Sequence, residues 1–466
     1  MINGHADPAG RSDVDVDVIV AGGGGAGLSA ALAAAHGGAS VVLAEARENF
    51  RYDCNTAMST AMVPAGGTRW QTVADIDDSP DRFYADIMAK TRGTADPTIA
   101  RALTSVGPDL VEWLNDRCEV PLELPTDFLY PGHSRHRCHC VHDRAGATLH
   151  RFLLQAVERE PSITLVAPLR IASIQLDSGG AVESATLSRP DGSAETIRTD
   201  AVILGVGGFG ANRGLVHRYI PEIENALYFG SGGNQGDALV IAQALGVDTG
   251  YLDAYQGHGS VATPHNILCT WISLTHGAIL VNNAGQRFGD EMRGYSEFAR
   301  YVVAQPDGVA FVVLDRRIDR LCQPFADYQA LEQHGGVRWA SDVQSLAQAI
   351  GAPHSALDET LTAARAAGLG QRADAFGRAH WEAPLEPPYG YVKVTGALFH
   401  TQGGLLVDAN AAVLRQGVPV RGLYSAGGSA AGLSGHGADG YMGGNGLLGA
   451  LGLGYLAGRA VAHHLV

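Results

Sequence analysis

After a polar lead, the chain runs through short apolar stretches separated by turns of small residues. Val16–Ala21 predicts a buried strand, the small residues of Leu28–Ala35 predict a helix, and Val41–Ala44 predicts a second strand. Glu45 follows the second strand directly. A strand, a glycine turn, a helix and a strand in this order are typical of a parallel sheet covered by helices.

The rest of the chain shows two kinds of pattern. In the first kind, helices are predicted at 80–92, 97–116 and 148–158, and a β-rich stretch is predicted at 164–204 with a hairpin turn at Asp191-Gly192. The character changes between about 251 and 394, where strand-like runs lie at 278–282 and 309–314 and helical stretches follow Ser341 and Ser355. After Thr395 the glycine-rich pattern returns, and it ends in a helix at 446–465.

These patterns predict an α/β protein in which one domain interrupts another. We expect a disordered lead at 1–14, an α/β domain made of 15–252 and 395–466, and an α+β cap domain at 253–394. No internal repeat, low-complexity tract or flexible linker is visible in the sequence.

Composition narrows the class of protein. The 466 residues are 46% hydrophobic and 17% charged, which is typical of a globular protein with a large core. A net charge of −15 argues against binding nucleic acid or an anionic membrane surface. The sequence predicts no membrane span, and the polar start and six scattered cysteines favour a cytoplasmic protein with reduced thiols.

The turn after the first strand carries the first chemical signal. In Gly22-Gly23-Gly24-Gly25-Ala26-Gly27, Gly22 permits a tight turn, Gly24 lets the backbone approach a pyrophosphate, and Gly27 lets the helix pack closely on the sheet. The phosphates would lie at the N-terminus of the helix, and Glu45 would accept hydrogen bonds from an adenosine ribose. This order of elements indicates a dinucleotide site.

Four segments together resemble the flavoprotein family of fumarate reductases, succinate dehydrogenases, L-aspartate oxidases and 3-ketosteroid dehydrogenases. The first is the glycine turn with Glu45. The others are 55–59 with Gly66-Gly67, the cap signature Gly285-Gln286-Arg287-Phe288-Gly289-Asp290-Glu291, and a set of glycine-rich loops at 400–404, 423–428 and 443–446. The resemblance covers nearly the whole chain from Val16.

The resemblance implies a Rossmann-like, three-layer FAD-binding domain of the glutathione reductase type, split by a cap that closes over the flavin. We expect non-covalent FAD, because no histidine lies near the Asn55 loop, where some members attach the flavin. The residues expected to contact FAD are Gly22, Gly24, Gly25, Ala26, Gly27, Glu45, Ala46, Asn55, Thr56, Ser59, Gly66, Gly67, Gly207, Gly208, Asp237, Gly403, Gly428, Asn445, Gly446 and Leu447.

Two departures from the family pattern change the expected substrate. The fumarate-reducing members have an arginine four residues after the glutamate of the cap signature and another just before the last glycine-glycine-asparagine. Here these positions hold Tyr295 and Tyr441. A tyrosine cannot bind a carboxylate through two parallel hydrogen bonds as an arginine does, so the change argues against fumarate.

Tyrosines at these positions resemble those of the ketosteroid dehydrogenases. That resemblance implies that Tyr295 removes a proton beside a ketone and that Tyr441 donates a hydrogen bond to the ketone oxygen. A phenol needs a nearby positive charge to act as a base, and the candidates are Arg293 and the dipole of the helix on the flavin side. His258 and His400 match substrate-binding histidines of the fumarate reductases, and Tyr130 is a third candidate substrate tyrosine. The mixture suits a smaller cyclic ketone, including one that carries a carboxylate.

The segment from Tyr130 to His142 contains four histidines and two cysteines, which are ligand types for zinc. Its spacing matches no standard zinc finger, and Arg135, Arg137 and Arg144 would repel a cation. We therefore expect no metal there.

Three functions remain open from the sequence. The first is FAD-dependent desaturation of the α,β bond of a ketone, with electrons passed to a quinone, a dye, oxygen or an electron-transfer protein. The second is an ene-reductase that acts on a carboxylate-bearing alkene, as His258 and His400 suggest. The third is a non-catalytic flavin-binding electron carrier, against which the large cap with its intact signature argues.

Overall fold

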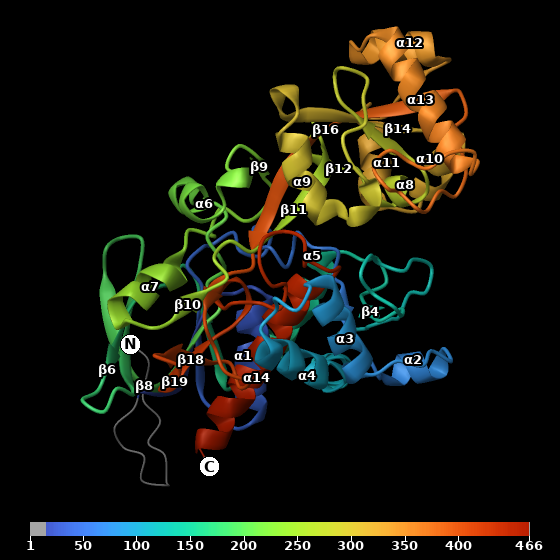
Figure 1. Cartoon of the computed structure of the whole chain (residues 1–466). Coiled ribbons are helices and arrows are strands. Elements are labelled where there is room, and N and C mark those ends of the chain that lie inside the picture. The colour runs from blue at the N-terminus through green and yellow to red at the C-terminus, as the bar shows by residue number, and fades with distance from the viewer. Residues whose placement is uncertain (1–14, 466) are drawn as a thin grey trace. The chain divides into compact units, whose positions relative to one another are not determined.

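The structure is a computed structural model that describes residues 15–465, so the lead predicted at 1–14 lies outside the described residues. The described chain divides into two compact units. The first, the flavin unit, comprises 15–220, 230–255 and 400–465, and the second, the cap unit, comprises 221–229 and 256–399. Figure 1 shows the elements of both units along the chain.

The flavin unit is built on a mostly parallel sheet. Its strand order is β18-β19-β8-β1-β2-β5, and β1 pairs in parallel with both β2 and β8, so that Val18 lies opposite Val41 on one side and Ala201 on the other. The bounds of these strands are β1 Val16–Ala21, β2 Val41–Ala44, β5 Ile163–Val166, β8 Ala194–Leu204, β18 Ala412–Arg415 and β19 Val418–Ser425. The parallel sheet confirms the α/β class that the sequence predicts.

The remaining strands of the flavin unit extend this sheet or form short separate pairs. Strands β6 (Arg170–Leu176) and β7 (Val182–Ser188) extend β8 as an antiparallel layer, and the hairpin at Asp191-Gly192 joins β7 to β8 as predicted. The short pairs are β3 (Val63–Pro64) with β4 (Cys138–His139), and β10 (Thr249–Gly250) with β17 (Gly404–Leu405).

Two helices of the flavin unit, α1 and α14, have their N-termini beside the sheet. Helices α1 and α14 lie side by side (Figure 1), because glycines of α14 let the backbones approach. A Cβ built on Gly454 would lie 2.4 Å from the carbonyl oxygen of Ala26, and one on Gly458 would lie 2.4 Å from that of Ala30. The helices are α1 Gly25–His36, α2 Arg69–Val73, α3 Pro80–Lys90, α4 Pro97–Asp116, α5 Gly146–Arg159, α6 Arg213–Tyr219, α7 Asp237–Leu245, η4 Gly427–Ser429 and α14 Asn445–Leu465.

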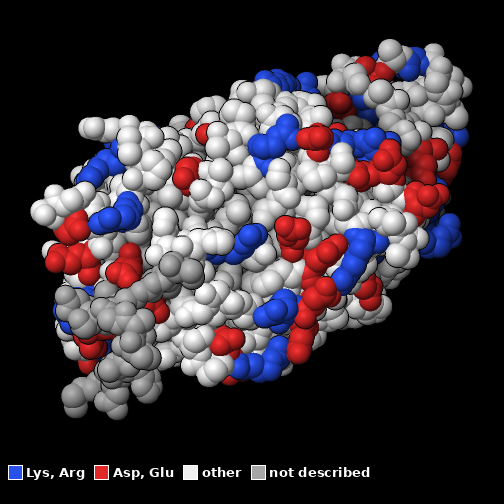
Figure 2. All heavy atoms as spheres, turned by 90° about the horizontal axis from the view of Figure 1, so that it is seen from below, with Lys and Arg blue, Asp and Glu red and all other residues white. Residues whose placement is uncertain are grey.

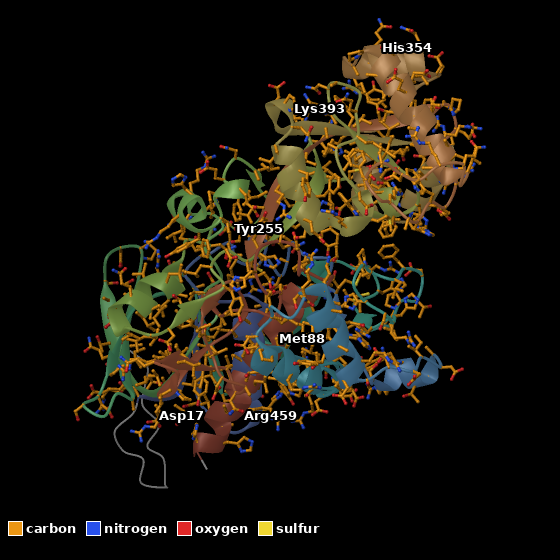
Figure 3. The ribbon with its side chains drawn as sticks, viewed as in Figure 1. Asp17, Met88, Tyr255, His354, Lys393 and Arg459 are labelled. Carbon is orange, nitrogen blue, oxygen red and sulfur yellow. The ribbon has the colours of Figure 1, made fainter. Side chains whose placement is uncertain are left out.

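The cap unit has its own sheet and its own core. Its central strands run in the order β12-β11-β16-β14-β13, and β9 and β15 also pair with β16. Tyr255, labelled in Figure 3, is the first residue of β11 and the last residue of the flavin unit before the chain enters the cap. The strands are β9 Leu227–Tyr228, β11 Tyr255–Ala262, β12 Ile267–Leu268, β13 Ile279–Val281, β14 Val309–Leu314, β15 Arg338–Ala340 and β16 Tyr389–Thr401.

Helices complete the cap around a second hydrophobic core that includes Leu280, Phe298 and Val312. These helices are η1 Pro221–Ile223, α8 Ile272–Thr275, η2 Glu291–Arg293, α9 Tyr295–Val303, η3 Pro306–Gly308, α10 Arg316–Cys322, α11 Ala326–Gln333, α12 Val343–Ile350 and α13 His354–Gly368.

The cap unit differs at both ends from the stretch predicted from the sequence, 253–394. Residues 221–229 join the cap because β9 pairs in parallel with Ala397 and Leu398 of β16, and the cap continues to Phe399 along the same strand. The short β9 carries no local pattern that would reveal this pairing.

Charge is dispersed over the surface. On the face drawn in Figure 2, acidic and basic side chains lie interspersed among uncharged ones. Among the described residues, no helix has both the length and the apolar character needed to cross a bilayer.

Candidate active site

The glycine turn between β1 and α1 has the geometry that its spacing predicts. Gly22 has φ +112°, and a Cβ there would lie 2.2 Å from the carbonyl oxygen of Gly205. A Cβ on Gly27 would lie 1.8 Å from the carbonyl oxygen of Gly22, so only glycine allows α1 to begin this close to the strand. A Cβ on Gly24 would meet only Thr56 Oγ1, at 3.9 Å, so space remains where the sequence expects a pyrophosphate.

Glu45 closes the turn from the end of β2. Its Oε2 accepts from the Gly23 N–H at 2.6 Å, and its Oε1 accepts from the Arg47 N–H at 2.7 Å. Burial raises the pKa of this carboxyl, while the hydrogen bonds to Gly23 and Arg47 lower it. Each carboxylate oxygen accepts more than one hydrogen bond, so the side chain can still accept from ribose hydroxyls. Ala46, the next residue, is exposed.

The loop at 53–60 is tied to this turn and to the segment at 231–234. Thr56 Oγ1 accepts from the Gly25 N–H at 2.9 Å, and Asn55 Oδ1 accepts from the Ser231 N–H at 2.8 Å and from Asn234 Nδ2 at 3.1 Å. Ser59 Oγ donates to the Thr56 carbonyl at 2.7 Å. These bonds fix the position of the loop, and its contact with the flavin stays a prediction.

Other predicted cofactor residues pack into the structure around the ends of β8 and β19. Cβ atoms on Gly207, Gly208 and Gly428 would lie 2.1 Å from Asn234 Oδ1, 2.1 Å from Thr401 Oγ1 and 2.7 Å from the Gly208 nitrogen. A Cβ on Gly403 would lie 2.0 Å from the carbonyl oxygen of Tyr251. Gly403 and Gly428 therefore need glycine for close backbone packing, whereas Gly207 and Gly208 make room for the side-chain oxygens of Asn234 and Thr401.

Three predicted positions have structural partners of their own. Asp237 at the start of α7 forms an ion pair with Arg170. The Gly67 N–H donates to Gln71 Oε1 at 2.7 Å, and a Cβ on Gly66 would lie 2.7 Å from the Ser79 carbonyl oxygen. These contacts give the three residues roles in the fold, and their contact with FAD stays a prediction.

The N-terminus of α14 brings together five of the predicted residues. A Cβ built on Gly446 would lie 2.8 Å from His400 Nε2 and 3.7 Å from the Tyr441 hydroxyl oxygen, so both polar atoms border the same point. The rings of His400 and Tyr441 meet edge to face with centroids 5.7 Å apart. The first turn of α14 also contains Asn445 and Leu447, both buried.

Both side chains at this point are held in the neutral form. Burial lowers the pKa of His400 to about 4, so that its imidazole is uncharged at neutral pH. Burial raises the pKa of Tyr441 far above its ordinary value, and the Gly446 N–H opposes this more weakly by hydrogen bonding to the phenol oxygen. The pair therefore presents a neutral imidazole and a neutral phenol at a helix N-terminus.

Tyr130 lies beside the same helix start. A Cβ built on Gly443 would lie 3.0 Å from its ring, and burial raises the pKa of its phenol well above the ordinary value. His133 Nε2 lies 3.0 Å from the Gly443 carbonyl oxygen, and Cys138 Sγ lies 3.8 Å from the same oxygen. The structure thus brings Tyr130 to the backbone that leads into α14.

The histidine-rich segment has packing partners. Arg137 is buried and donates to Asp78 through Nε and Nη2, each at 2.9 Å, and to Asp86 through Nη1 at 2.6 Å. His139 Nε2 lies 2.9 Å from Thr68 Oγ1. Among the described residues, no three histidine, cysteine or acidic side chains are grouped so that they could hold a metal ion.

In the cap unit, His258 and Tyr295 lie together. Their rings stack with centroids 5.0 Å apart, and His258 also stacks on Phe399 at 5.3 Å and meets Trp271 edge to face at 5.8 Å. The His258 Nδ1 accepts from the Ser260 N–H at 3.2 Å, which leaves the ring proton on Nε2. Burial lowers the pKa of His258 to about 3, so this ring is neutral too.

Tyr295 takes its position from the start of a helix. It is the first residue of α9 and follows Gly294, whose φ of +127° favours glycine. A helix N-terminus favours negative charge, which suits a phenol that removes a proton. Arg293, the charge suggested from the sequence, is exposed and donates to the Tyr301 hydroxyl at 3.3 Å.

The cap signature anchors this helix. Glu291 is fully buried and accepts from Arg287 Nε at 2.9 Å, from Arg287 Nη2 at 2.6 Å and from Arg378 Nη1 at 3.3 Å. Arg287 also pairs with Asp374 at 2.5 Å. Because Glu291 begins η2, directly before α9, this ion cluster holds the chain that leads to Tyr295.

The structure thus gathers the sequence-predicted catalytic residues in two groups. His400, Tyr441 and Tyr130 belong to the flavin unit, and His258 and Tyr295 belong to the cap unit. Sequence reasoning missed Gln402, whose Nε2 lies 3.2 Å from His400 Nδ1, although it lies inside a recognised segment. It also missed Ser434, which donates to Gln402 Oε1 at 3.0 Å and carries no motif signal. It also missed Trp271 and Phe399, whose contacts with His258 appear only in the fold.

Comparison with known proteins identifies the family. A model described as an FAD binding domain matches residues 17–447, and the chain belongs to this family. The chain is 29% identical, over 93% of its length, to NADH:fumarate oxidoreductase of Klebsiella pneumoniae (strain 342), of which it spans 46%. It therefore spans less than half the length of that relative.

Two solved structures are similar over nearly the whole chain. One is the open conformation of a flavocytochrome c3 fumarate reductase, with TM-score 0.81, 25% identity, and 98% of this chain and 80% of that chain covered. The other is 3-ketosteroid-Δ4-(5α)-dehydrogenase of Rhodococcus jostii RHA1, with TM-score 0.77, 24% identity, and 99% and 100% covered. The predicted Rossmann-like fold and the resemblance to both groups are confirmed.

The protein therefore belongs to an FAD-binding family, and its residues fit the cofactor. Gly24 leaves room beside the N-terminus of α1, and Glu45 retains the capacity to accept further hydrogen bonds. Asn445 Oδ1, buried at the start of α14, has no hydrogen-bond partner among the described residues, so it can accept from a polar ring edge. FAD supplies a ring that accepts or donates a hydride.

Proposed function

We propose that the protein desaturates the α,β C–C bond of a ketone, a cyclic one above all. In this proposal Tyr441 and His400 donate hydrogen bonds to the ketone oxygen, and Tyr295 takes the proton from the α-carbon. The β-hydride passes to FAD, and an external acceptor, such as a quinone, a dye, oxygen or an electron-transfer protein, removes the electrons. His258 and Tyr130 line the substrate. A cytoplasmic location stays a prediction.

One observation supports the proposal most strongly. His400 of β16 and Tyr441, which precedes α14, border one point at the N-terminus of α14, and both side chains are neutral. Neutral donors stabilise the negative charge that grows on a ketone oxygen as the α-proton leaves, and removal of one such donor costs about 10²–10³-fold in rate. A carboxylate would instead favour arginine, which holds it through two parallel hydrogen bonds.

The proposed reaction balances one proton and one hydride. Loss of a proton from the α-carbon and of a hydride from the β-carbon leaves a C=C bond conjugated with the carbonyl. The donors at His400 and Tyr441 make the α-proton more acidic, because they stabilise the enolate oxygen. Tyr295, at the N-terminus of α9, lies where a helix favours the negative charge of a phenolate.

A reductase is the second candidate, because the relatives named above reduce fumarate. In that case His258 and His400 would hold a carboxylate-bearing alkene, and the reaction would run in the opposite direction. The tyrosines at 295 and 441 stand against fumarate itself, since neither can replace an arginine.

A substrate panel separates the two candidates. The FAD-loaded enzyme is mixed anaerobically with cyclohexanone, oxocyclohexanecarboxylates and 3-ketosteroids, and the bleaching of the oxidised flavin is followed. Bleaching by one ketone class supports the dehydrogenase and gives its substrate size. If no ketone bleaches the flavin but enones or fumarate reoxidise the dithionite-reduced enzyme, the protein is a reductase.

Substitution of each tyrosine tests its role. We expect Tyr295→Phe to lower the rate of flavin reduction by about 10²–10⁴-fold, the range for loss of a general base, and Tyr441→Phe by about 10²–10³-fold. Both variants should keep their FAD content, because neither hydroxyl is needed to fold the glycine turn. Full activity in Tyr295→Phe would show that another group removes the proton.

A further inference from the structure

A line of hydrogen bonds links the start of α14 to His400 inside the flavin unit. Asn445 Nδ2 donates to Ser434 Oγ at 3.5 Å, Ser434 Oγ donates to Gln402 Oε1 at 3.0 Å, and Gln402 Nε2 lies 3.2 Å from His400 Nδ1. Gln402, Ser434 and Asn445 are 6%, 1% and 1% exposed, so water cannot easily substitute for these partners.

Such a line can run in only two directions. In the first, each group donates toward His400, so Nδ1 accepts from Gln402 and the ring proton lies on Nε2. In the second, both amides are turned over, so Nδ1–H donates to Gln402 and Nε2 becomes an acceptor. The direction therefore decides whether His400 offers a donor or an acceptor at Nε2.

His400 Nδ1 also lies 3.4 Å from the Thr401 carbonyl oxygen, which could accept from an Nδ1–H, but this contact is longer than the 3.2 Å contact with Gln402. The end of the line at Asn445 favours the first direction. In that direction the buried atom without a partner among the described residues is an amide oxygen, Asn445 Oδ1. In the reverse direction it would be the Asn445 amide nitrogen with its N–H groups. Buried N–H groups without partners are rarer in proteins than carbonyl oxygens that lack them.

We propose that Gln402 and Ser434 are positioning residues that hold His400 as the tautomer with its proton on Nε2. The inference rests on the proposed function and deepens it, because Nε2 is the His400 atom that borders the point beside Gly446. A ring fixed in this way gives a hydrogen bond to an oxygen and cannot receive one. The site then favours substrates that present an acceptor oxygen, such as a carbonyl, over those that present only an N–H donor at that point.

The tautomer is measured directly on the FAD-loaded enzyme without substrate. Histidine is labelled with ¹⁵N, the His400 ring signals are assigned by comparison with His400→Asn, and couplings to the ring protons show which nitrogen carries hydrogen. We expect Nε2–H in the wild type at neutral pH. A wild-type ring with its proton on Nδ1 overturns the proposal.

Substitution of Gln402 should reverse the assignment. An ionised carboxylate only accepts, so Gln402→Glu requires His400 Nδ1 to donate, and the ring signals should show hydrogen on Nδ1. The nearby negative charge should also raise the pKa of His400 above the value near 4, adding a titration to the pH profile of kcat/KM. An unchanged ring spectrum in Gln402→Glu overturns the proposal.

A matched pair of serine variants covers the case in which Gln402→Glu does not fold. Ser434→Ala breaks the line and should leave a mixture of both tautomers. The control Ser29→Ala removes another buried hydroxyl of the same unit, which donates to the Leu451 carbonyl at 2.8 Å. This control should leave the ring signals of His400 unchanged. If Ser434→Ala keeps a single Nε2–H tautomer, Ser434 does not set it and the proposal fails.

The readout also separates this inference from the proposed function. The tautomer is observed before any substrate is added, so an Nε2–H ring in an enzyme that no ketone reduces leaves the inference standing and rejects the ketone dehydrogenase. Conversely, if ketones bleach the flavin but His400 carries its proton on Nδ1, the ketone dehydrogenase is supported and the inference about the tautomer is rejected.

Discussion

At the scale of single residues, the turn between β1 and α1 contains glycines that are needed for two different physical reasons. Gly27 is required by the fold, because a Cβ there would lie 1.8 Å from a backbone oxygen. The described chain leaves room for a larger residue than glycine at position 24, since the nearest atom to a Cβ there would lie 3.9 Å away. The sequence predicted both glycines from their spacing, and the structure supports a different physical role for each.

This difference predicts opposite phenotypes for two alanine variants. Gly27→Ala should destabilise the folded unit by more than the about 1–3 kcal/mol of ordinary overpacking, because backbone atoms cannot rotate away. Gly24→Ala should fold normally and lose FAD affinity, because its methyl group occupies the space kept for the cofactor. Thermal midpoints of the apoproteins and FAD titrations measure the two effects, and a Gly24→Ala protein with unchanged FAD affinity would contradict the assignment.

The residues around His400 show where sequence reasoning stops. His400 and Tyr441 were found because each stands at a fixed distance from a recognisable glycine motif. Gln402 lies two residues from His400 and contacts it directly, whereas Ser434 reaches Gln402 through a bond between positions 32 residues apart. No local pattern marks this glutamine or serine for these contacts. Polar positioning of this kind depends on the folded loops.

At the scale of elements, the cap signature proves to be a structural anchor. Its arginine and glutamate were known from the sequence as a motif, and the structure shows that both are buried in one ion cluster with Arg378 and Asp374. The cluster fixes η2 and hence the start of α9, where Tyr295 lies. The motif therefore acts on the proposed chemistry by placing a helix.

Breaking this cluster should destabilise the cap. Glu291→Gln leaves two buried guanidinium groups without a full counter-charge, a change that costs about 3–5 kcal/mol in buried ion pairs. The matched control is Glu386→Gln, whose ion pair with Arg365 is about half exposed, at 54% and 49%, and should cost about 0–1 kcal/mol. Proteolytic cleavage of the cap under native conditions compares the two, and equal rates would contradict the anchoring role.

Elements with a strong periodic pattern were predictable with their ends. Helix α4 at Pro97–Asp116 and strand β14 at Val309–Leu314 have the predicted bounds, because Asp96 caps the helix and the strand is a continuous buried run. The short strand β9 was not predictable, because its pairing with β16 joins segments about 170 residues apart and because a strand of two residues carries no periodic pattern.

At the scale of the whole molecule, the buried histidines couple stability to pH. Burial lowers the pKa of His133, His139 and His400 to about 4 and that of His258 to about 3, whereas a histidine in the unfolded chain titrates near 6.5. Between about pH 6.5 and pH 4 the unfolded chain therefore binds protons that the native protein does not. Stability is fully present above about pH 6.5 and falls as the pH decreases, by up to about 1.4 kcal/mol per pH unit for each histidine.

We therefore expect the thermal midpoint of the FAD-loaded protein to decrease from about pH 6.5 downward, above the range in which paired carboxylates such as Asp86 and Asp374 become protonated. His139→Gln removes one of these titrations and should make the decrease shallower, whereas His464→Gln, at an exposed position, should leave it unchanged. The midpoint is followed by flavin fluorescence in a series of buffers of equal ionic strength. A midpoint that stays constant from about pH 7 to pH 5.5 would show that these histidines are hydrated in the folded protein, and would remove the basis for treating His258 and His400 as neutral donors.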